Sequence, residues 1–374
     1  MKYDKFFSED VGSFMRSPVR EIFKKVDLAA IYSFAGGYPD AATFPIGDIR
    51  RISAQVLDRY GAKALQYGAT QGVPELRQVI AQRYGVAVEN VQITTSSQQG
   101  IDVCTRVFAD PGDVILTTSP TYLGALQSFK SYRADIRTLE DFGWDKPVKF
   151  CYVIPDFQNP SGETMDLAAR EALVALAREH DFLIVEDSPY RELRYSGTPQ
   201  PTLYSLAPER TLHLGSFSKV FAPGFRLGWI LAPVELLDQI YVCKQSLDLC
   251  PPILDQYIAA EFMGSGALDA NLQKSIALYR AKRDKMLALL EKYMPAGVSW
   301  THPEGGLFLF LTLPEGFDTV ALYDRALSAG VAYVAGSFFF VDGSHRNTMR
   351  LNFSFLDASR MEAGIQLLAK VIQE

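Results

Sequence analysis

The sequence TLHLGSFSKVFAPGFRLGWILA, residues 211–232, determines how the rest of the chain is interpreted. Short apolar runs typical of buried strands flank a polar turn that carries Ser216, Ser218, Lys219 and Arg226. Lysines normally belong on the protein surface, so a lysine between two buried strands needs an explanation. One chemistry covers all four side chains: the amine holds an aldehyde cofactor as a Schiff base, and the hydroxyls and the guanidinium bind its phosphate. The alternative is a surface turn with a solvated lysine, and this segment alone does not decide between the two.

Size and composition limit the possible classes of protein. A chain of 374 residues exceeds what one hydrophobic core usually serves, so we expect a large domain and a smaller one. The net charge of −6 argues against nucleic acid or an anionic membrane as a partner. The sequence shows no signal-peptide core and no membrane-spanning run, so we expect a cytoplasmic protein. The four cysteines and four histidines lack metal-binding spacing, so we expect no metal site.

Short apolar runs alternate with amphipathic segments between residues 91 and 187. This alternation predicts a largely parallel sheet with helices on both faces, an α/β fold. Residues 233–292 are mostly helical in pattern, and we expect a long helix at 272–293 to link the two domains. Strand-like runs and a final helix at 357–373 then predict a smaller α+β domain.

The first sixty residues are less regular. Residues 18–28 have helical apolar spacing, and residues 46–60 predict a further helix. Between them, residues 31–45 are too irregular for a secondary-structure element. Their paired glycines either let the backbone approach a ligand closely or form a plain turn.

Polar side chains follow several of the predicted strands. In parallel sheets, ligands bind at the carboxyl ends of the strands, so these side chains should share one rim. They are Ser97, Gln98, Tyr122, Asn159, Asp187, Tyr190 and Lys219.

Three of these polar positions keep alternatives open. Ser97 and Gln98 begin a predicted helix, where they form either an anion site or a simple N-cap. Asp187 ends a buried strand and needs a partner, which could be a cofactor, a helix cap or Arg191. Arg350, within a strand of the small domain, is either a solvent-facing edge residue or a fork for an anion.

Seven sequence blocks together resemble a known family. They are SFAGGYP (33–39), QYGATQGVPELR (66–77), TTSSQQGID (94–102), NPSG (159–162), EDSPY (186–190), GSFSKVFAPGFRLGW (215–229) and MRLNFS (349–354). In these blocks the chain resembles the fold-type I, pyridoxal-phosphate-dependent aminotransferases of class I/II, nearest to the aromatic, kynurenine and 2-aminoadipate aminotransferases. The resemblance covers nearly the whole chain.

The resemblance implies a domain plan. The large domain should hold a mainly parallel seven-stranded sheet and bind pyridoxal 5'-phosphate (PLP) within residues 46–285. The small α+β domain should occupy residues 286–374, with residues 1–45 as an arm contributing to it. The resemblance also implies a homodimer with shared active sites.

The resemblance also assigns roles to individual residues. Lys219 would form the Schiff base, Asp187 would pair with the pyridine nitrogen, and Tyr122 would stack on the ring. The other contacts would be Tyr190 and Asn159 at the ring hydroxyl oxygen; Ser97, Gln98, Ser216, Ser218, Arg226 and a neighbouring subunit's Tyr67 at the phosphate; Arg350, Gly37 and Asn159 around the substrate; and Arg20 at the substrate's distal group. Three residues depart from common family patterns, Ser161, Ser188 and Tyr38, and only Tyr38 puts the substrate pocket in question.

The function implied is transfer of an amino group from an aromatic or 2-aminoadipate-like L-amino acid to a 2-oxo acid such as 2-oxoglutarate, with ping-pong kinetics. A lyase, racemase or decarboxylating enzyme could use the same cofactor contacts. A transcriptional regulator with an aminotransferase-like sensor domain is disfavoured by the acidic charge and by a fold that begins near Met1. Aromatic side chains are plentiful, but most of them fit a core as well as a substrate pocket.

Overall fold

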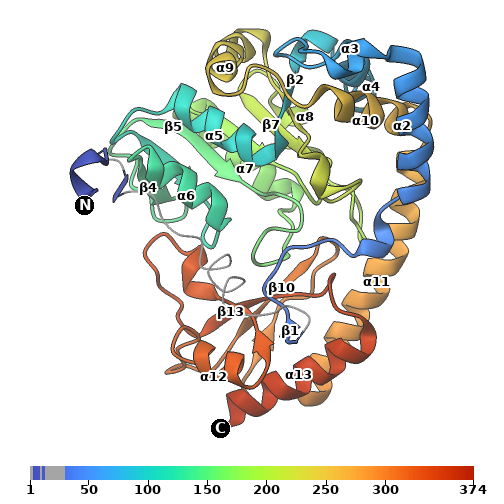
Figure 1. The fold of residues 1–374 in the computed structure, drawn as a ribbon. Coiled ribbons are helices and arrows are strands. Elements are labelled where there is room, and N and C mark those ends of the chain that lie inside the picture. The colour runs from blue at the N-terminus through green and yellow to red at the C-terminus, as the bar shows by residue number, and fades with distance from the viewer. Residues whose placement is uncertain (1–2, 9–10, 13–29) are drawn as a thin grey trace.

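A seven-stranded sheet forms the centre of the larger half of the molecule in the computed structural model, which describes residues 3–8, 11–12 and 30–374 (Figure 1). The strand order is β2-β8-β7-β6-β5-β3-β4. Neighbouring strands from β7 to β4 pair in parallel, and β8 runs antiparallel to both of its neighbours. The strands are β2 (Val91–Thr94), β3 (Val114–Thr117), β4 (Asp135–Thr138), β5 (Val148–Val153), β6 (Leu183–Asp187), β7 (Thr211–Ser216) and β8 (Gly228–Leu231). The mainly parallel α/β fold predicted from the sequence is confirmed.

The central strands are buried along nearly their whole length, as continuous apolar runs in a sheet covered on both faces require. The edge strand β4 is different because its four residues are partly or largely exposed. Its sequence DIRT carries two charged residues and no apolar alternation, so the sequence analysis did not predict it.

Helices connect the strands and cover the sheet. Helix α5 packs on β7 and β8, while α10 packs against both α2 and α4 at the far end of this half (Figure 1). Helix α2 has the predicted bounds, and α4 begins at Pro74, where the missing N–H costs nothing. The helices of this half are α2 (Ile46–Tyr60), α3 (Ala62–Leu65), α4 (Pro74–Tyr84), α5 (Ser96–Phe108), α6 (Leu123–Ser131), α7 (Leu167–Glu179), α8 (Leu203–Leu206), α9 (Val234–Leu247) and α10 (Ile253–Gly264).

The smaller half contains a four-stranded antiparallel sheet of order β12-β13-β10-β9. Its strands are β9 (Ser299–Trp300), β10 (Phe308–Thr312), β12 (Val334–Ala335) and β13 (Thr348–Asn352), and its helices are α12 (Tyr323–Ser328) and α13 (Ala358–Gln373). Helix α11 (Ala267–Tyr293) runs along both halves and starts five residues earlier than predicted (Figure 1). The predicted domain boundary between residues 285 and 286 falls within α11, so this boundary stays a prediction.

The expectation that residues 31–45 contain no element was wrong. Strand β1 (Tyr32–Ser33) pairs in parallel with β11 (Val331–Ala332), and the short 3-10 helix η3 (Ala41–Thr43) follows. The pairing is only two residues long, too short for its alternation to be visible in the sequence. Through it the segment is joined to the smaller half, and the glycine loop that follows extends toward the sheet rim.

Candidate active site

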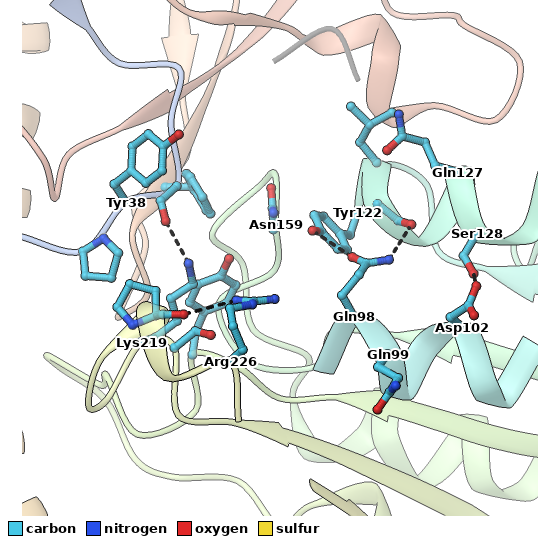
Figure 2. Close-up of a pocket in the computed structure, with 18 of the residues that line it drawn as sticks. Tyr38, Gln98, Gln99, Asp102, Tyr122, Gln127, Ser128, Asn159, Lys219 and Arg226 are labelled. Carbon is cyan, nitrogen blue, oxygen red and sulfur yellow. Dashed lines mark hydrogen bonds between the residues drawn. The ribbon is translucent and has the colours of Figure 1, made fainter. Parts of the chain in front are cut away.

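Two adjoining cavities lie where the parallel strands end. The inner cavity has a volume of about 140 Å³ and the outer one about 980 Å³. Seven residues line both: Gln98, Tyr122, Asn159, Tyr190, Ser218, Lys219 and Arg226. Lys219 and Arg226 lie on one side of the space, and Tyr122 and Gln98 face them across it (Figure 2). The polar residues at the strand ends therefore share one rim, as the sequence analysis expected.

Lys219 projects from the turn after β7. Its Nζ donates to the Gly37 carbonyl oxygen at 2.8 Å, so the glycine loop reaches the lysine (Figure 2). Desolvation by the surrounding protein lowers the pKa of Lys219 to about 8, and the positive charges of Arg350 and Arg226 act in the same direction. A neutral amine is the nucleophilic form, so this environment prepares Lys219 for attack on a carbonyl.

Asp187 ends strand β6 and lies deep in the inner cavity. Its Oδ2 accepts a hydrogen bond from the Tyr152 hydroxyl at 2.7 Å, and its Oδ1 has no partner among the described residues. Burial raises the pKa of Asp187 to about 6. The alternatives left open by the sequence, a helix cap or an ion pair with Arg191, do not occur. Arg191 instead pairs with Asp156 at 2.8 Å.

Arg350 is a buried cation that lines the outer cavity. It lies on β13, the strand between β12 and β10, and is 4 % exposed, which excludes a solvent-facing edge position. Its Nη1 donates to Asn159 Oδ1 at 2.7 Å and its Nη2 donates to the Ala35 carbonyl oxygen at 2.6 Å. Its Nε has no partner among the described residues. A buried guanidinium whose hydrogen-bond partners among the described residues include no carboxylate is available for an anionic ligand.

The part of the inner cavity next to the start of helix α5 suits a phosphate. Helix α5 begins there at Ser96, so its free N–H groups and dipole favour an anion. Arg226 donates from Nη2 to Ser96 Oγ at 2.6 Å, and its backbone has a left-handed φ of 52°. Strained backbone of this kind concentrates at ligand sites. A Cβ on Gly228 would lie 2.7 Å from the Ser97 nitrogen, so only glycine lets β8 pass this close to the helix start.

Comparison with known proteins identifies the family. Residues 35–368 match the model of the family described as aminotransferase class I and II. The chain belongs to this family. The match spans both halves of the fold and all of the described cavity residues.

Individual class I and II aminotransferases are similar over the whole chain. An aromatic-amino-acid aminotransferase of Thermococcus litoralis is 43% identical, covering 100% of this chain and 95% of that protein. A kynurenine aminotransferase structure from Pyrococcus horikoshii, a complex with PMP and KYN as substrates and KYA as products, has a TM-score of 0.95 at 40% identity. An alpha-aminoadipate aminotransferase structure from Thermus thermophilus, with N-(5'-phosphopyridoxyl)-L-leucine, has a TM-score of 0.94 at 35% identity. Both structures are matched over 100% of this chain and 98% of theirs.

The chain is therefore an aminotransferase whose cofactor is PLP, and the cavity fits that cofactor. The unpartnered Asp187 Oδ1 is an acceptor for a protonated pyridine nitrogen, and the lysine amine is suited to an aldehyde. The α5 N-terminus and Arg226 supply positive charge for a phosphate. The pyridine nitrogen, the aldehyde and the phosphate of the cofactor thus each have a matching protein group at this aminotransferase site.

The roles predicted for Arg20 and Tyr67 stay predictions. Arg20 lies outside the described residues. Tyr67, predicted to serve a neighbouring subunit, is 79 % exposed and lines a separate surface groove. The Gln98 side chain accepts from the Tyr122 hydroxyl at 3.2 Å and donates to the Gly124 carbonyl at 3.1 Å, so its amide holds the tyrosine in place.

Two further residues were missed. Ser96 contacts Arg226, and Tyr152 contacts Asp187. Ser96 stands next to Ser97 at the strand end and could have been included on position alone. Tyr152 lies inside an apolar strand, where nothing in the sequence distinguishes it from a core aromatic residue.

The described residues contain no group of three or more His, Cys, Asp and Glu side chains arranged to hold a metal. Within the same residues no helix is both long and apolar enough to cross a membrane.

Proposed function

We propose that this aminotransferase moves an amino group from an aromatic or 2-aminoadipate-like L-amino acid to a 2-oxo acid such as 2-oxoglutarate, by ping-pong kinetics. The observation that carries the proposal is Arg350, a buried guanidinium in the same cavity as Lys219 with an Nε that lacks a partner. An α-carboxylate bound there lies in the cavity that Lys219 also lines. Amino acids and 2-oxo acids share this carboxylate, so one site serves both half-reactions.

The residues around the cofactor have separate tasks in this proposal. Asp187 accepts a hydrogen bond from the protonated ring nitrogen, and Tyr122 stacks on the ring. Tyr190 and Asn159, which both line the inner cavity, hydrogen-bond the ring hydroxyl oxygen. The phosphate is bound by Ser97, the backbone of Gln98, Ser216, Ser218 and Arg226.

Lys219 moves the proton of the reaction. When bound, PLP supplies an electron-accepting ring that makes the Cα proton of the donor acidic. With PLP bound, the Lys219 amine would accept the Cα proton of the donor and would return it later in the transfer. Its pKa of about 8 suits both steps, because a base and acid working near neutral pH needs a pKa near that pH.

The donor class follows from the walls of the outer cavity. Phe308 and Phe339 both lie against Arg350, with their ring centroids 4.2 and 5.1 Å from the guanidinium carbon. Tyr38 lines the mouth, half exposed, beside Phe355. Aromatic rings at the carboxylate site and at the mouth favour donors with large apolar or aromatic side chains. The names of the similar aminotransferases agree with this choice, and Arg20 remains the proposed contact for a distal carboxylate.

A homodimer completes the site in this proposal. Arg226 is largely exposed, although its guanidinium lines the inner cavity. Tyr67 lines a groove of about 720 Å³ together with Leu65, Ile253 and Leu254. A second copy of the chain seated on this groove covers apolar surface and brings its own Tyr67 hydroxyl to the phosphate. We also propose that the enzyme is cytoplasmic, with residues 46–285 and 286–374 as its domains and residues 1–45 as an arm of the smaller one.

A panel of amino donors tests the proposed reaction. Phenylalanine, tyrosine, kynurenine, 2-aminoadipate, aspartate and alanine are each supplied with 2-oxoglutarate or pyruvate, and both the new amino acid and the new 2-oxo acid are quantified. The proposal predicts equal amounts of both products, with kcat/KM highest for the aromatic donors or 2-aminoadipate. Release of ammonia, carbon dioxide or the D-amino acid without amino transfer would favour the lyase, decarboxylase or racemase alternative.

A further inference from the structure

The Tyr152 hydroxyl is the hydrogen-bond partner of Asp187. Tyr152 lies on β5 and Asp187 ends the neighbouring parallel strand β6. The hydroxyl donates to Asp187 Oδ2 at 2.7 Å, and the tyrosine is 0 % exposed. Its ring packs edge-on against Phe129 at a centroid distance of 5.6 Å. The hydroxyl therefore has a fixed position inside the sheet layer.

This contact gives the two oxygens of the Asp187 carboxylate different surroundings. Oδ2 is occupied by Tyr152, and Oδ1 has no partner among the described residues although Asp187 lines the inner cavity. A carboxylate held at one oxygen cannot rotate freely. The second oxygen thus keeps one direction and is left for a hydrogen-bond donor in the cavity.

The contact also affects how a proton is shared between Asp187 and the ring nitrogen of bound PLP. Burial raises the pKa of Asp187, whereas the hydrogen bond from Tyr152 lowers it. If the Asp187 carboxylate became a stronger base than the ring nitrogen, the proton would move from the ring nitrogen to Asp187. The ring would then lose the positive charge on which electron withdrawal depends.

We propose that Tyr152 is a positioning residue for the cofactor, which holds one oxygen of Asp187 so that the other remains an ionised acceptor for the protonated ring nitrogen. The inference rests on the role proposed above for Asp187. Tyr152 acts through Asp187 and does not itself need to touch substrate or cofactor.

The substitution Tyr152→Phe tests the inference with little change in shape, since it removes one oxygen and keeps the ring. Tyr333→Phe is a matched control. Tyr333 is also 0 % exposed and its hydroxyl also donates at 2.7 Å, but to the Thr319 carbonyl in the smaller half. Urea unfolding of both cofactor-free variants checks that each is folded.

Three measurements separate a role at the cofactor from a structural role. We expect Tyr152→Phe to weaken PLP binding to the cofactor-free protein about tenfold, since a hydrogen bond to a charged group is lost. We expect the pH midpoint of the bound cofactor's absorbance to rise by about half a unit or more, because a less charged ring withdraws fewer electrons from its bond to Lys219. We expect kcat to fall about tenfold with KM for the donor changed less than about twofold. Tyr333→Phe should change each quantity less than about twofold.

A double-variant cycle gives the decisive comparison. In an Asp187→Asn background the carboxylate charge is gone, so adding Tyr152→Phe should alter PLP affinity by less than about twofold. A full tenfold loss in that background would overturn the inference, as would a Tyr152→Phe variant that matches Tyr333→Phe in affinity and absorbance. If Tyr152→Phe alone does not fold, Tyr152→His is used as a rescue test. It keeps a ring and a hydrogen-bond donor, so its PLP affinity should stay within about threefold of that of the unaltered protein, and a tenfold loss would overturn the inference. Failure of the unaltered protein to bind PLP would contradict the cofactor assignment instead, and so is distinguishable.

Discussion

Arg350 and Asn159 join the two halves of the molecule through a buried hydrogen bond of 2.7 Å between residues 191 positions apart in the sequence. Arg350 comes from strand β13 of the smaller half and Asn159 from the loop after β5 of the larger one. Asn159 and Tyr190 both line the inner cavity. The proposed substrate cation is thus hydrogen-bonded directly to a proposed ring contact.

Replacement of Arg350 should primarily weaken substrate binding. The Arg350→Ala variant loses a charge-assisted fork, with each hydrogen bond to a charged group worth about 1.5–3 kcal/mol. We expect KM for the amino donor to rise at least about tenfold and KM for the 2-oxo acid to rise with it. Arg346→Ala is the control, since Arg346 is exposed and pairs with Asp318 at 2.6 Å. An unchanged KM in Arg350→Ala would remove this residue from the site.

Asp187 should make the stability of the cofactor-free protein depend on pH. Its folded pKa of about 6 lies above the ordinary 3.8, so the folded state holds the proton more tightly. Stability from this group is therefore present below about pH 4 and is lost as pH rises to 6. Above pH 6 the buried charge costs on the order of 3 kcal/mol, and Asp187→Asn should remove that cost.

Urea unfolding of both cofactor-free proteins between pH 4.5 and 8 measures the effect. The stability gain from Asp187→Asn should grow with pH up to about pH 6 and then stay constant. A gain that is independent of pH would mean that the substitution acts through packing and not through the carboxylate charge. In the presence of PLP the order should reverse, because the asparagine cannot hold the ring charge.

Tyr67 should act in the active site of a second subunit. We expect Tyr67→Ala to weaken PLP binding about tenfold through loss of a charge-assisted contact to the phosphate. Mixed dimers of the Tyr67→Ala and Lys219→Ala variants then offer a stringent control. One of the two sites in such a dimer carries both substitutions and the other carries neither. At a PLP concentration too low to fill the Tyr67→Ala sites, mixing should therefore recover activity that neither parent has. Absence of recovery in verified mixed dimers would mean that Tyr67 serves its own subunit or none.

The pattern of strands and turns predicted most of the arrangement because the site lies where strands end. Lys219 and Asp187 each follow a buried apolar run directly, and strand ends of a parallel sheet converge whatever the details of packing. Arg350 could not be decided from sequence, since its burial depends on β13 being flanked by β10 and β12. That flanking is a property of strand order, which local sequence does not encode.

Contacts between side chains on different strands were not predictable. Tyr152 and Asp187 lie 35 positions apart, and their bond depends on the register between β5 and β6. The Asp156 cluster is similar, because its carboxylate is buried among Arg170 and Arg191 from separate segments. The weak strand β4 escaped prediction for another reason: it lies at the sheet edge and carries polar residues that need no burial.

The covalent bond at Lys219 is the central claim, and reduction with borohydride tests it most directly. The protein is loaded with PLP, reduced, digested and mapped by mass spectrometry, with the Lys219→Ala variant treated in parallel. We predict one modified site, a phosphopyridoxyl group on the Lys219 side chain, with loss of turnover in the variant although it stays folded. A modification on another lysine, or none on a protein that transaminates, would contradict the account.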